Sequence, residues 1–344
     1  MKMMKIGLVG YQGSGKSTVF ELLTGVQPDP SKAYSGQAGM AAIPDDRFER
    51  LVELYQPKKI VPAKIELFDT PGLSRDQHEA NVQHLGIIRE AAALVHVIGC
   101  FAGCDPLADA SAFTDDLVLA DLQVVENRIK RLKKDATKPR PDREELQAEL
   151  EAIEPIAAKL NEGEMLQDFE LNELQEKAVK SFSLLTRKQR LILLNTADAG
   201  FDDALVHQLK GANVVAAPVG LELELQAFPS EERAEFAGEM GLGEPCRERL
   251  LQAIFSVTDQ ITFYTCADKE VHAWLLKRGS TALEAADSIH SDLARGFIRA
   301  DIMAGDELLR LGSEREVKAA GLQHVEGKGY VVLDGDEIFV RSGI

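Results

Sequence analysis

The chain has 344 residues, of which 45 % are hydrophobic and 28 % are charged, proportions typical of a globular protein of about two domains. Its 39 Lys and Arg against 56 Asp and Glu give a formal charge of −17, which excludes a protein whose whole surface binds nucleic acid. No stretch approaches the ~18 uncharged apolar residues of a transmembrane helix, so we expect no membrane contact.

The N-terminus and the cysteines indicate where the protein works. The opening residues, MKMMKIGLVG, lead directly into a glycine loop and predict a buried strand instead of a signal peptide. The four cysteines are too few and too scattered for a disulfide framework. We therefore expect a cytoplasmic protein with free thiols.

The first hundred residues alternate strand-like and helical patterns, which is typical of a parallel α/β sheet. KIGLVG (5–10), AKIELFD (63–69) and AALVHVIGCF (92–101) predict strands, the last apolar enough for a central one. KSTVFELLTG (16–25) predicts a helix that ends at a glycine.

Residues 10–18, GYQGSGKST, match the pattern G-x-x-x-x-G-K-[ST] between a predicted strand and a predicted helix. In this setting the backbone N–H groups and the helix N-terminus hold phosphate groups, whereas a glycine-rich turn matching by chance would lack the flanking elements. Lys16 is expected to reach the β- and γ-phosphates, and Ser17 to ligate Mg²⁺. The predicted nucleotide-binding residues of this loop are Gly13, Ser14, Gly15, Lys16, Ser17 and Thr18.

The stretch IELFDTPGL (65–73) is the second predicted part of the site. An apolar strand brings Asp69 to its C-terminal end, where a doubly wound sheet binds nucleotide. Asp69 is expected to hold Mg²⁺ and the Gly72 N–H to contact the γ-phosphate, so Lys16 and Gly72 are the predicted catalytic groups. On its own, D-T-P-G also fits a turn capped by Asp.

Helical periodicity replaces the alternating pattern from about residue 115. Two amphipathic stripes, one around Leu122–Leu132 and one around Leu146–Leu160, flank TKPRPD and predict an antiparallel helical hairpin. Between Arg128 and Arg143, eight basic residues stand against two acidic ones, a local charge of +6. This run is either a solvated surface or a contact for a phosphate backbone.

Strand patterns return at RLILLN (190–195) and NVVAAPV (213–219). The segment NTADAG places Asp198 three residues after Asn195, similar to the guanine-reading motif N-K-x-D; the alternative is an Asx turn at a strand end. From about residue 258 a small α+β domain is predicted, with a hairpin around Asp334 and Gly335.

These motifs, in this order, resemble a G domain of the translation-factor class. PDDRFERL, GIIREAAALVHVIGCF and, above all, DQITFYTCADKEVHAWLLKRGSTALEAADSIHSDLARGFIRADIM resemble the Obg-like ATPase (YchF-type) family. The resemblance implies an α/β, doubly wound P-loop G domain with an inserted α-helical arm and a C-terminal β-grasp, ubiquitin-like TGS domain. The expected boundaries are 1–114 and 189–257 for the two parts of the G domain, 115–188 for the arm and 258–344 for the TGS domain.

The resemblance also implies a slow, Mg²⁺-dependent nucleoside triphosphatase that binds GTP or ATP and acts with a ribosome or RNA partner. Leu73 stands where Ras-like proteins have a water-orienting Gln, and Gly13 where the family usually has Asn. PVG, centred on Val219, aligns with the usual S-A-K loop, so Val219 joins Asn195 and Asp198 as an expected base contact. The alternative function is a nucleotide-regulated binding module with negligible hydrolysis, working through its TGS and arm surfaces.

The identity of the base is testable at Asp198. A carboxylate that accepts two hydrogen bonds from guanine has no such role toward adenine, so Asp198→Ala is expected to weaken GTP binding more than ATP binding. Calorimetry with Mg²⁺ measures both affinities. An equal loss for the two nucleotides would show that Asp198 does not read guanine.

Overall fold

The computed structural model describes residues 4–76, 78–136, 141–167, 169–197, 203–209, 213–239 and 245–343. The chain forms two units, one of residues 4–39 and 66–250, the other of residues 40–65 and 251–344 together with the first three residues. Within the described ranges, no helix is both long enough and apolar enough to span a bilayer.

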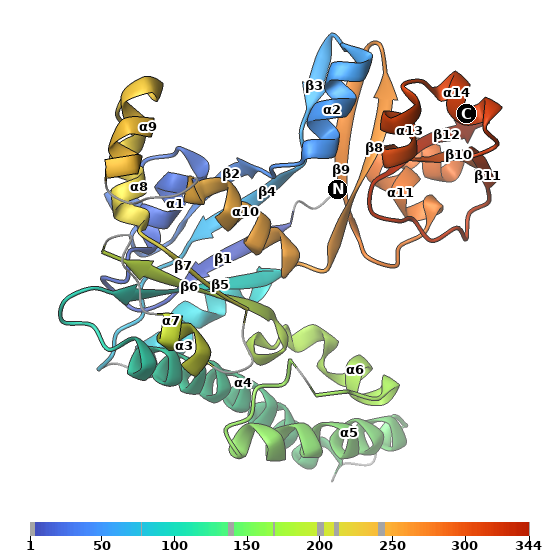
Figure 1. The fold of residues 1–344 in the computed structure, drawn as a ribbon. Coiled ribbons are helices and arrows are strands. Elements are labelled where there is room, and N and C mark those ends of the chain that lie inside the picture. Colours follow the sequence, from blue (N-terminus) through green and yellow to red (C-terminus); the bar gives the residue numbers. More distant parts are fainter. Residues whose placement is uncertain are drawn as a thin grey trace. The chain divides into compact units, whose positions relative to one another are not determined.

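The larger unit is built on a mostly parallel sheet (Figure 1). β1 lies between β4 and β5 and is parallel to both, and β5 continues in parallel to β6 and then β7. Because the chain adds β4 on one side of β1 and β5 on the other, strand order reverses at the end of β1, where such sheets bind ligands. In spatial order the strands are β2 (Gln37–Ala42), β4 (Lys64–Asp69), β1 (Lys5–Val9), β5 (Ala93–Cys100), β6 (Gln189–Thr196) and β7 (Asn213–Ala217).

The strands predicted from the sequence at 5–10, 63–69 and 92–101 are thereby confirmed, as are those after residue 189. Helices and short 3₁₀ turns connect them. The helices are α1 (Lys16–Thr24), α3 (His78–Ile87), α4 (Pro106–Ala136), α5 (Arg143–Asn161), α6 (Glu173–Val179), α7 (Asp203–Gln208), α8 (Val219–Gln226), α9 (Ser230–Glu239) and α10 (Cys246–Ser256), with 3₁₀ turns at Pro30–Lys32, Ile88–Glu90, Lys180–Phe182 and Leu185–Arg187.

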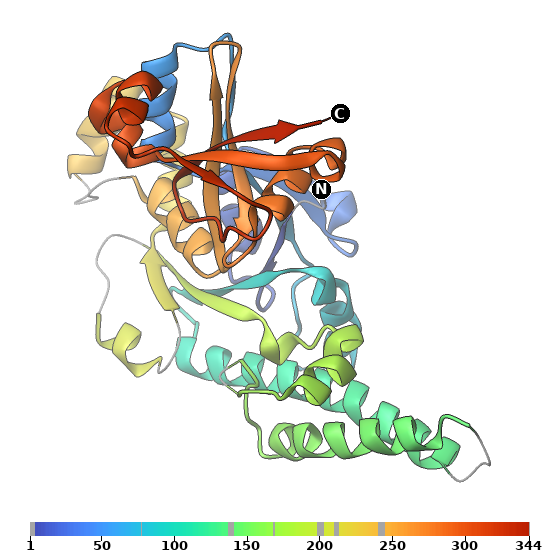
Figure 2. The ribbon, with the colours of Figure 1, turned by 90° about the vertical axis from the view of Figure 1, so that its right-hand side faces the viewer.

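The helical arm is dominated by α4, whose 31 residues extend for about 46 Å. The predicted hairpin is present, since α4 and α5 run side by side (Figure 2), although α4 begins nine residues before the expected start of the arm. The first half of α4 buries Phe113 and Leu117 with the core of the sheet, and the second half buries Val125 and Leu132 against α5. One continuous helix therefore joins the sheet to the arm.

The smaller unit contains a second sheet, in the order β11-β10-β12-β8-β9-β3. β8 and β9 form an antiparallel hairpin, β12 lies between β10 and β8, and helices pack on this framework. Its elements are α2 (Asp46–Tyr55), β3 (Lys59–Val61), β8 (Gln260–Ala267), β9 (Glu270–Lys277), α11 (Ala282–Ile289), α12 (Ser291–Arg295), β10 (Phe297–Ala304), α13 (Gly305–Leu311), α14 (Glu314–Ala319), β11 (His324–Glu326) and β12 (Asp336–Ser342).

The structure departs from the expected domain boundaries at residues 40–65. These residues fall with the C-terminal unit instead of the first part of the G domain, because β3 pairs in parallel with β9. The α2 helix belongs to the same unit: Asp45 accepts a hydrogen bond from the Tyr264 hydroxyl at 2.6 Å, and Tyr55 donates to Glu314 at 3.0 Å.

The predicted hairpin around Asp334 and Gly335 is wrong. Only the second run becomes a strand, β12, whereas Val331 forms an isolated bridge to Thr281. Gly335, with φ of 90°, instead turns the chain into β12 and donates its N–H to the Thr262 carbonyl. Asp-Gly usually indicates a hairpin because its glycine adopts a positive φ. Here the same turn leads the chain into β12, which pairs with β10 and β8, two strands that are distant in sequence.

Candidate functional site

The loop between β1 and α1 has the geometry of a phosphate-binding loop. Gly10, Gly13 and Gly15 have φ angles of 142°, 80° and 92°, which side-chain-bearing residues rarely adopt. A Cβ on Gly15 would come within 2.1 Å of the Asn195 side chain, whereas a Cβ on Gly13 would meet no described atom within 4 Å. The glycines thus permit both a tight turn and an open backbone surface.

A cavity of about 380 Å³ opens on this loop, within the larger unit. Four parts of the chain line it: the loop itself, residues 28–37, residues 69–72 at and after the end of β4, and His84 on α3. The lining residues are Gln12, Gly13, Lys16, Ser17, Pro28, Asp29, Pro30, Lys32, Ala33, Tyr34, Gln37, Asp69, Thr70, Pro71, Gly72 and His84. The structure therefore brings together the predicted residues Gly13, Lys16, Ser17, Asp69 and Gly72.

Lys16 is the central cation of the cavity. Its side chain is buried, with the residue 6 % exposed, and Nζ donates a hydrogen bond to the Tyr11 carbonyl at 2.8 Å. Burial lowers the pKa of this ammonium group to about 8, although the Asp69 carboxylate acts in the opposite direction. Burial deprives this ammonium group of water, and a bound polyphosphate would stabilise it with negative charge.

Ser17 and Asp69 offer an arrangement that fits a divalent cation. The Ser17 hydroxyl donates to Asp69 Oδ2 at 2.7 Å, and Asp69 Oδ1 is buried without a hydrogen-bond partner among the described residues. Burial raises the pKa of the Asp69 carboxyl. A hydroxyl and a carboxylate are hard oxygen ligands, and Mg²⁺ typically takes one or two such protein ligands beside phosphate oxygens.

Residues 72 and 73 are joined closely to the phosphate loop. The Gln12 N–H donates to the Leu73 carbonyl at 2.9 Å, and the Leu73 N–H donates to the Gly10 carbonyl at 3.1 Å. A Cβ on Gly72 would lie 2.9 Å from the Gln12 side chain, so only glycine fits there without displacement. The Leu73 side chain is 3 % exposed and packs in the core with Tyr11, away from the cavity.

The remaining predicted residues are placed less completely. Ser14 is buried and its carbonyl accepts a hydrogen bond from Asn195 Nδ2 at 3.1 Å, and Thr18 lies half-buried in the first turn of α1. Val219 begins α8 with its side chain fully buried, which leaves only its backbone available to a ligand. Asp198 lies outside the described residues, so the base motif is represented by Asn195 alone.

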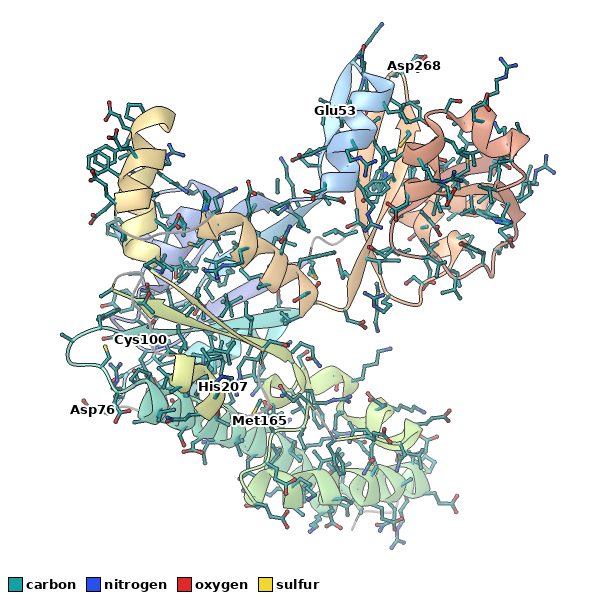
Figure 3. The ribbon with its side chains drawn as sticks, viewed as in Figure 1. Glu53, Asp76, Cys100, Met165, His207 and Asp268 are labelled. Carbon is teal, nitrogen blue, oxygen red and sulfur yellow. The ribbon has the colours of Figure 1, made fainter. Side chains whose placement is uncertain are left out.

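Two residues behind the cavity lining were not predicted from the sequence. Arg75 makes a two-bond pair with Asp109 and lies over the Tyr11 ring, with Cζ 5.0 Å from the ring centroid. In Figure 3, Asp76, the residue after Arg75, lies near the start of α4, the helix that carries Asp109. The Tyr11 hydroxyl in turn donates to Asp116 at 3.0 Å. Neither Arg75 nor Asp109 belongs to a recognised motif, so local sequence carries no signal for them.

Comparisons with known proteins agree with this architecture. Residues 5–139 match a family described as 50S ribosome-binding GTPase, and residues 260–342 match the YchF GTPase C-terminal family, described as a protein of unknown function. The chain is 33 % identical to the ribosome-binding ATPase YchF of Haemophilus influenzae over 99 % of both chains. The chain belongs to the YchF family.

Other members of the YchF family extend this relationship. The ribosome-binding ATPase YchF of Bacillus subtilis is 32 % identical over 98 % of this chain and 99 % of its own length. Obg-like ATPase 1 of Oryza sativa is 30 % identical over 99 % and 92 %. The solved structure of the Schizosaccharomyces pombe YchF GTPase matches with a TM-score of 0.85 at 25 % identity, over 98 % and 97 % of the two chains.

The pKa of Lys16 predicts how triphosphate affinity depends on pH. Above pH 8 the free protein carries a neutral Lys16, whereas a bound triphosphate favours the ammonium form and raises its pKa, so binding takes up a proton. The dissociation constant is therefore expected to rise by up to about tenfold per pH unit between pH 8 and 9.5.

Calorimetry in buffers of different ionisation enthalpy measures both the affinity and the proton uptake. Lys16→Ala serves as the control, with weaker binding and no pH slope in this range. Constant affinity with no proton uptake in the unmodified protein would contradict the prediction.

Proposed function

We propose that this protein is a slow, Mg²⁺-dependent nucleoside triphosphatase of the cytoplasm that binds GTP or ATP and acts as a nucleotide-dependent switch on the ribosome. The observation that carries the proposal is the convergence of Lys16, Ser17, Asp69 and Gly72 on one cavity beside an open glycine loop. Relatives named as ribosome-binding ATPases support both the activity and the partner.

In this proposal the reaction is in-line attack of water on the γ-phosphate. Ser17 and Asp69 would hold Mg²⁺, which supplies positive charge to the phosphate oxygens. The loop N–H groups and Lys16 stabilise charge on the β- and γ-phosphates, and the Gly72 N–H contacts the γ-phosphate. Asn195, Asp198 and the backbone of Val219 are the proposed contacts to the base.

Slow turnover follows from Leu73. Its side chain is apolar and buried, so it offers no hydrogen bond to orient the attacking water. A partner that orders the cavity can therefore control the rate. The names of the relatives favour this function over a binding module with negligible hydrolysis.

Single-turnover hydrolysis tests the function. We expect slow phosphate release from GTP or ATP by the unmodified protein, faster release with ribosomes, and none from Lys16→Ala, because that variant loses the central phosphate cation. If neither condition gives release above the Lys16→Ala control, the protein is a binding module and the triphosphatase proposal fails.

The proposed ribosome or RNA contact involves the basic run Arg128–Arg143 on the arm and the TGS domain. Much of the charge in this run is paired within the arm: Arg128 forms two 2.7 Å bonds with Glu149, and Lys133 lies 2.8 Å from Glu154. Arg131 is exposed. Contact with phosphates would therefore exchange some internal pairs for external ones.

We expect charge reversal of four basic residues on the arm to weaken ribosome association; the residues are Lys130, Arg131, Lys133 and Lys134. The plot of log affinity against log salt concentration should also become flatter, by about one unit of slope for each phosphate that the variant no longer binds. Sedimentation with ribosomes at several salt concentrations gives this slope. Reversal of Lys177 and Lys180, exposed lysines on and just after α6, is the control. An unchanged slope in the arm variant would leave the run as solvated surface.

A further inference from the structure

Arg75 lies next to Gln12, a residue that lines the cavity of the phosphate loop, although Arg75 is not itself a lining residue. Its Nη1 points to the Gln12 carbonyl at 3.5 Å, and Gln12 both lines the cavity and contacts Gly72. The side chain of Arg75 is 47 % exposed. Burial lowers the pKa of Lys16, the Asp69 carboxylate raises it, and the charge of Arg75 has the smallest effect of the three and lowers it.

The guanidinium group is held in place from behind. Asp109, on the first turn of α4, accepts Nε at 2.8 Å and Nη2 at 2.6 Å, and its side chain is 10 % exposed. Two parallel bonds of this kind fix the plane of a guanidinium as well as its position. Stacking on the Tyr11 ring adds a third restraint.

The backbone that carries Arg75 is also fixed. Asn81 on α3 accepts the Ser74 N–H and donates to the Ser74 carbonyl, both at 2.8 Å. Asn81 donates as well to Asp116, which accepts the Tyr11 hydroxyl. The residue before Arg75 is therefore tied to the same polar network as the loop beneath it.

This geometry leaves one side of the guanidinium available. Nε and Nη2 are engaged by Asp109, whereas Nη1 makes only the long contact to the Gln12 carbonyl among the residues that the structure describes. Nη1 carries two N–H groups, so it can donate one of them to a phosphate oxygen at the Gln12 edge while the Asp109 pair stays intact.

The chemistry of this cavity also calls for a further cation. Lys16 and Lys32 are the only Lys or Arg among the described residues that line it. Gly13 carries no side chain that could help to bind a monovalent ion, and Leu73 faces the core. At the Gln12–Gly72 edge, charge developing on the γ-phosphoryl oxygens is then met by backbone N–H groups, with Lys16 as the one nearby side-chain cation of the proposed phosphate contacts.

We infer that Arg75 is an arginine finger supplied within the chain, whose Nη1, held in position by the Asp109 pair, donates to the γ-phosphoryl oxygens in the transition state. The inference rests on the proposed triphosphatase function. Water forms the new bond to the γ-phosphorus, the bond to the β–γ bridging oxygen breaks, and the diphosphate leaves with the electron pair. The proton from water ends on the phosphate products, and Arg75 donates hydrogen bonds without losing a proton.

The test compares Arg75→Ala and Arg75→Gln with the unmodified protein in single-turnover hydrolysis of GTP and ATP. Both variants are expected to lose about a hundredfold in rate, the usual effect of removing one preorganised donor to the transition state, while affinity for a non-hydrolysable triphosphate changes less than threefold. Arg75→Gln keeps a hydrogen-bond donor for Asp109. A loss of hydrolysis rate in this variant as well would therefore not arise only from disturbed packing around Asp109.

Two further measurements separate chemistry from structure. Free guanidinium ion is expected to restore part of the rate of Arg75→Ala, and aluminium fluoride is expected to tighten diphosphate binding in the unmodified protein but not in the variant. Arg187→Ala is the matched control, because Arg187 makes a comparable two-bond pair with Glu176, at 2.8 and 2.7 Å, away from the cavity residues. Its hydrolysis rate should be unchanged.

The inference is overturned if both Arg75 variants hydrolyse within twofold of the Arg187→Ala control, or if their loss of rate is matched by loss of affinity. It is also overturned if neither guanidinium nor aluminium fluoride distinguishes them. Failure of the proposed function gives a different result, since the unmodified protein itself would then not exceed Lys16→Ala.

Discussion

Two backbone hydrogen bonds, between Gln12 and Leu73 and between Leu73 and Gly10, support the architecture of the site. They join the phosphate loop to the segment after β4, so the groups predicted to contact the γ-phosphate share one rigid backbone unit. Only glycine fits at position 72, because Gln12 lies directly against it. The buried Leu73 side chain also anchors this segment. Because Leu73 is apolar, the site has no polar side chain at this position that could orient the attacking water.

The α4 helix extends this connection. Its buried acids Asp109 and Asp116 are held by Arg75 and Tyr11 respectively, and further along the same helix Asp121 accepts hydrogen bonds from Thr186. Buried carboxylates are stable only when such partners are present. The helix is thus attached to the phosphate loop at one end and packed against α5 at the other, a physical link between cavity and arm.

Sequence reasoning succeeded where the determinants are local. The glycine loop and Asp69 follow from a strand, a tight turn and a helix start that lie within a few residues of one another. Placement of residues 40–65 could not be predicted, because β3 pairs with a strand about two hundred residues away. The hairpin at Asp334 and Gly335 was wrongly predicted because an Asp-Gly pair indicates a turn with positive φ but does not indicate which strands that turn connects. Arg75 was missed since its meaning depends on Asp109, 34 residues later.

The pairing of β3 with β9 has a consequence for synthesis. Lys59 and its ion-pair partner Glu270 are 211 residues apart, so at roughly 5–20 residues per second the ribosome produces the partner strand about 10 to 40 s after β3 has been made. During that interval α2 and β3 have no sheet to join, and Ile60, Phe48 and Tyr55 remain without their native neighbours. The nascent chain therefore carries, between two strands of its first sheet, a segment that cannot complete its native packing until the C-terminal strands have been made.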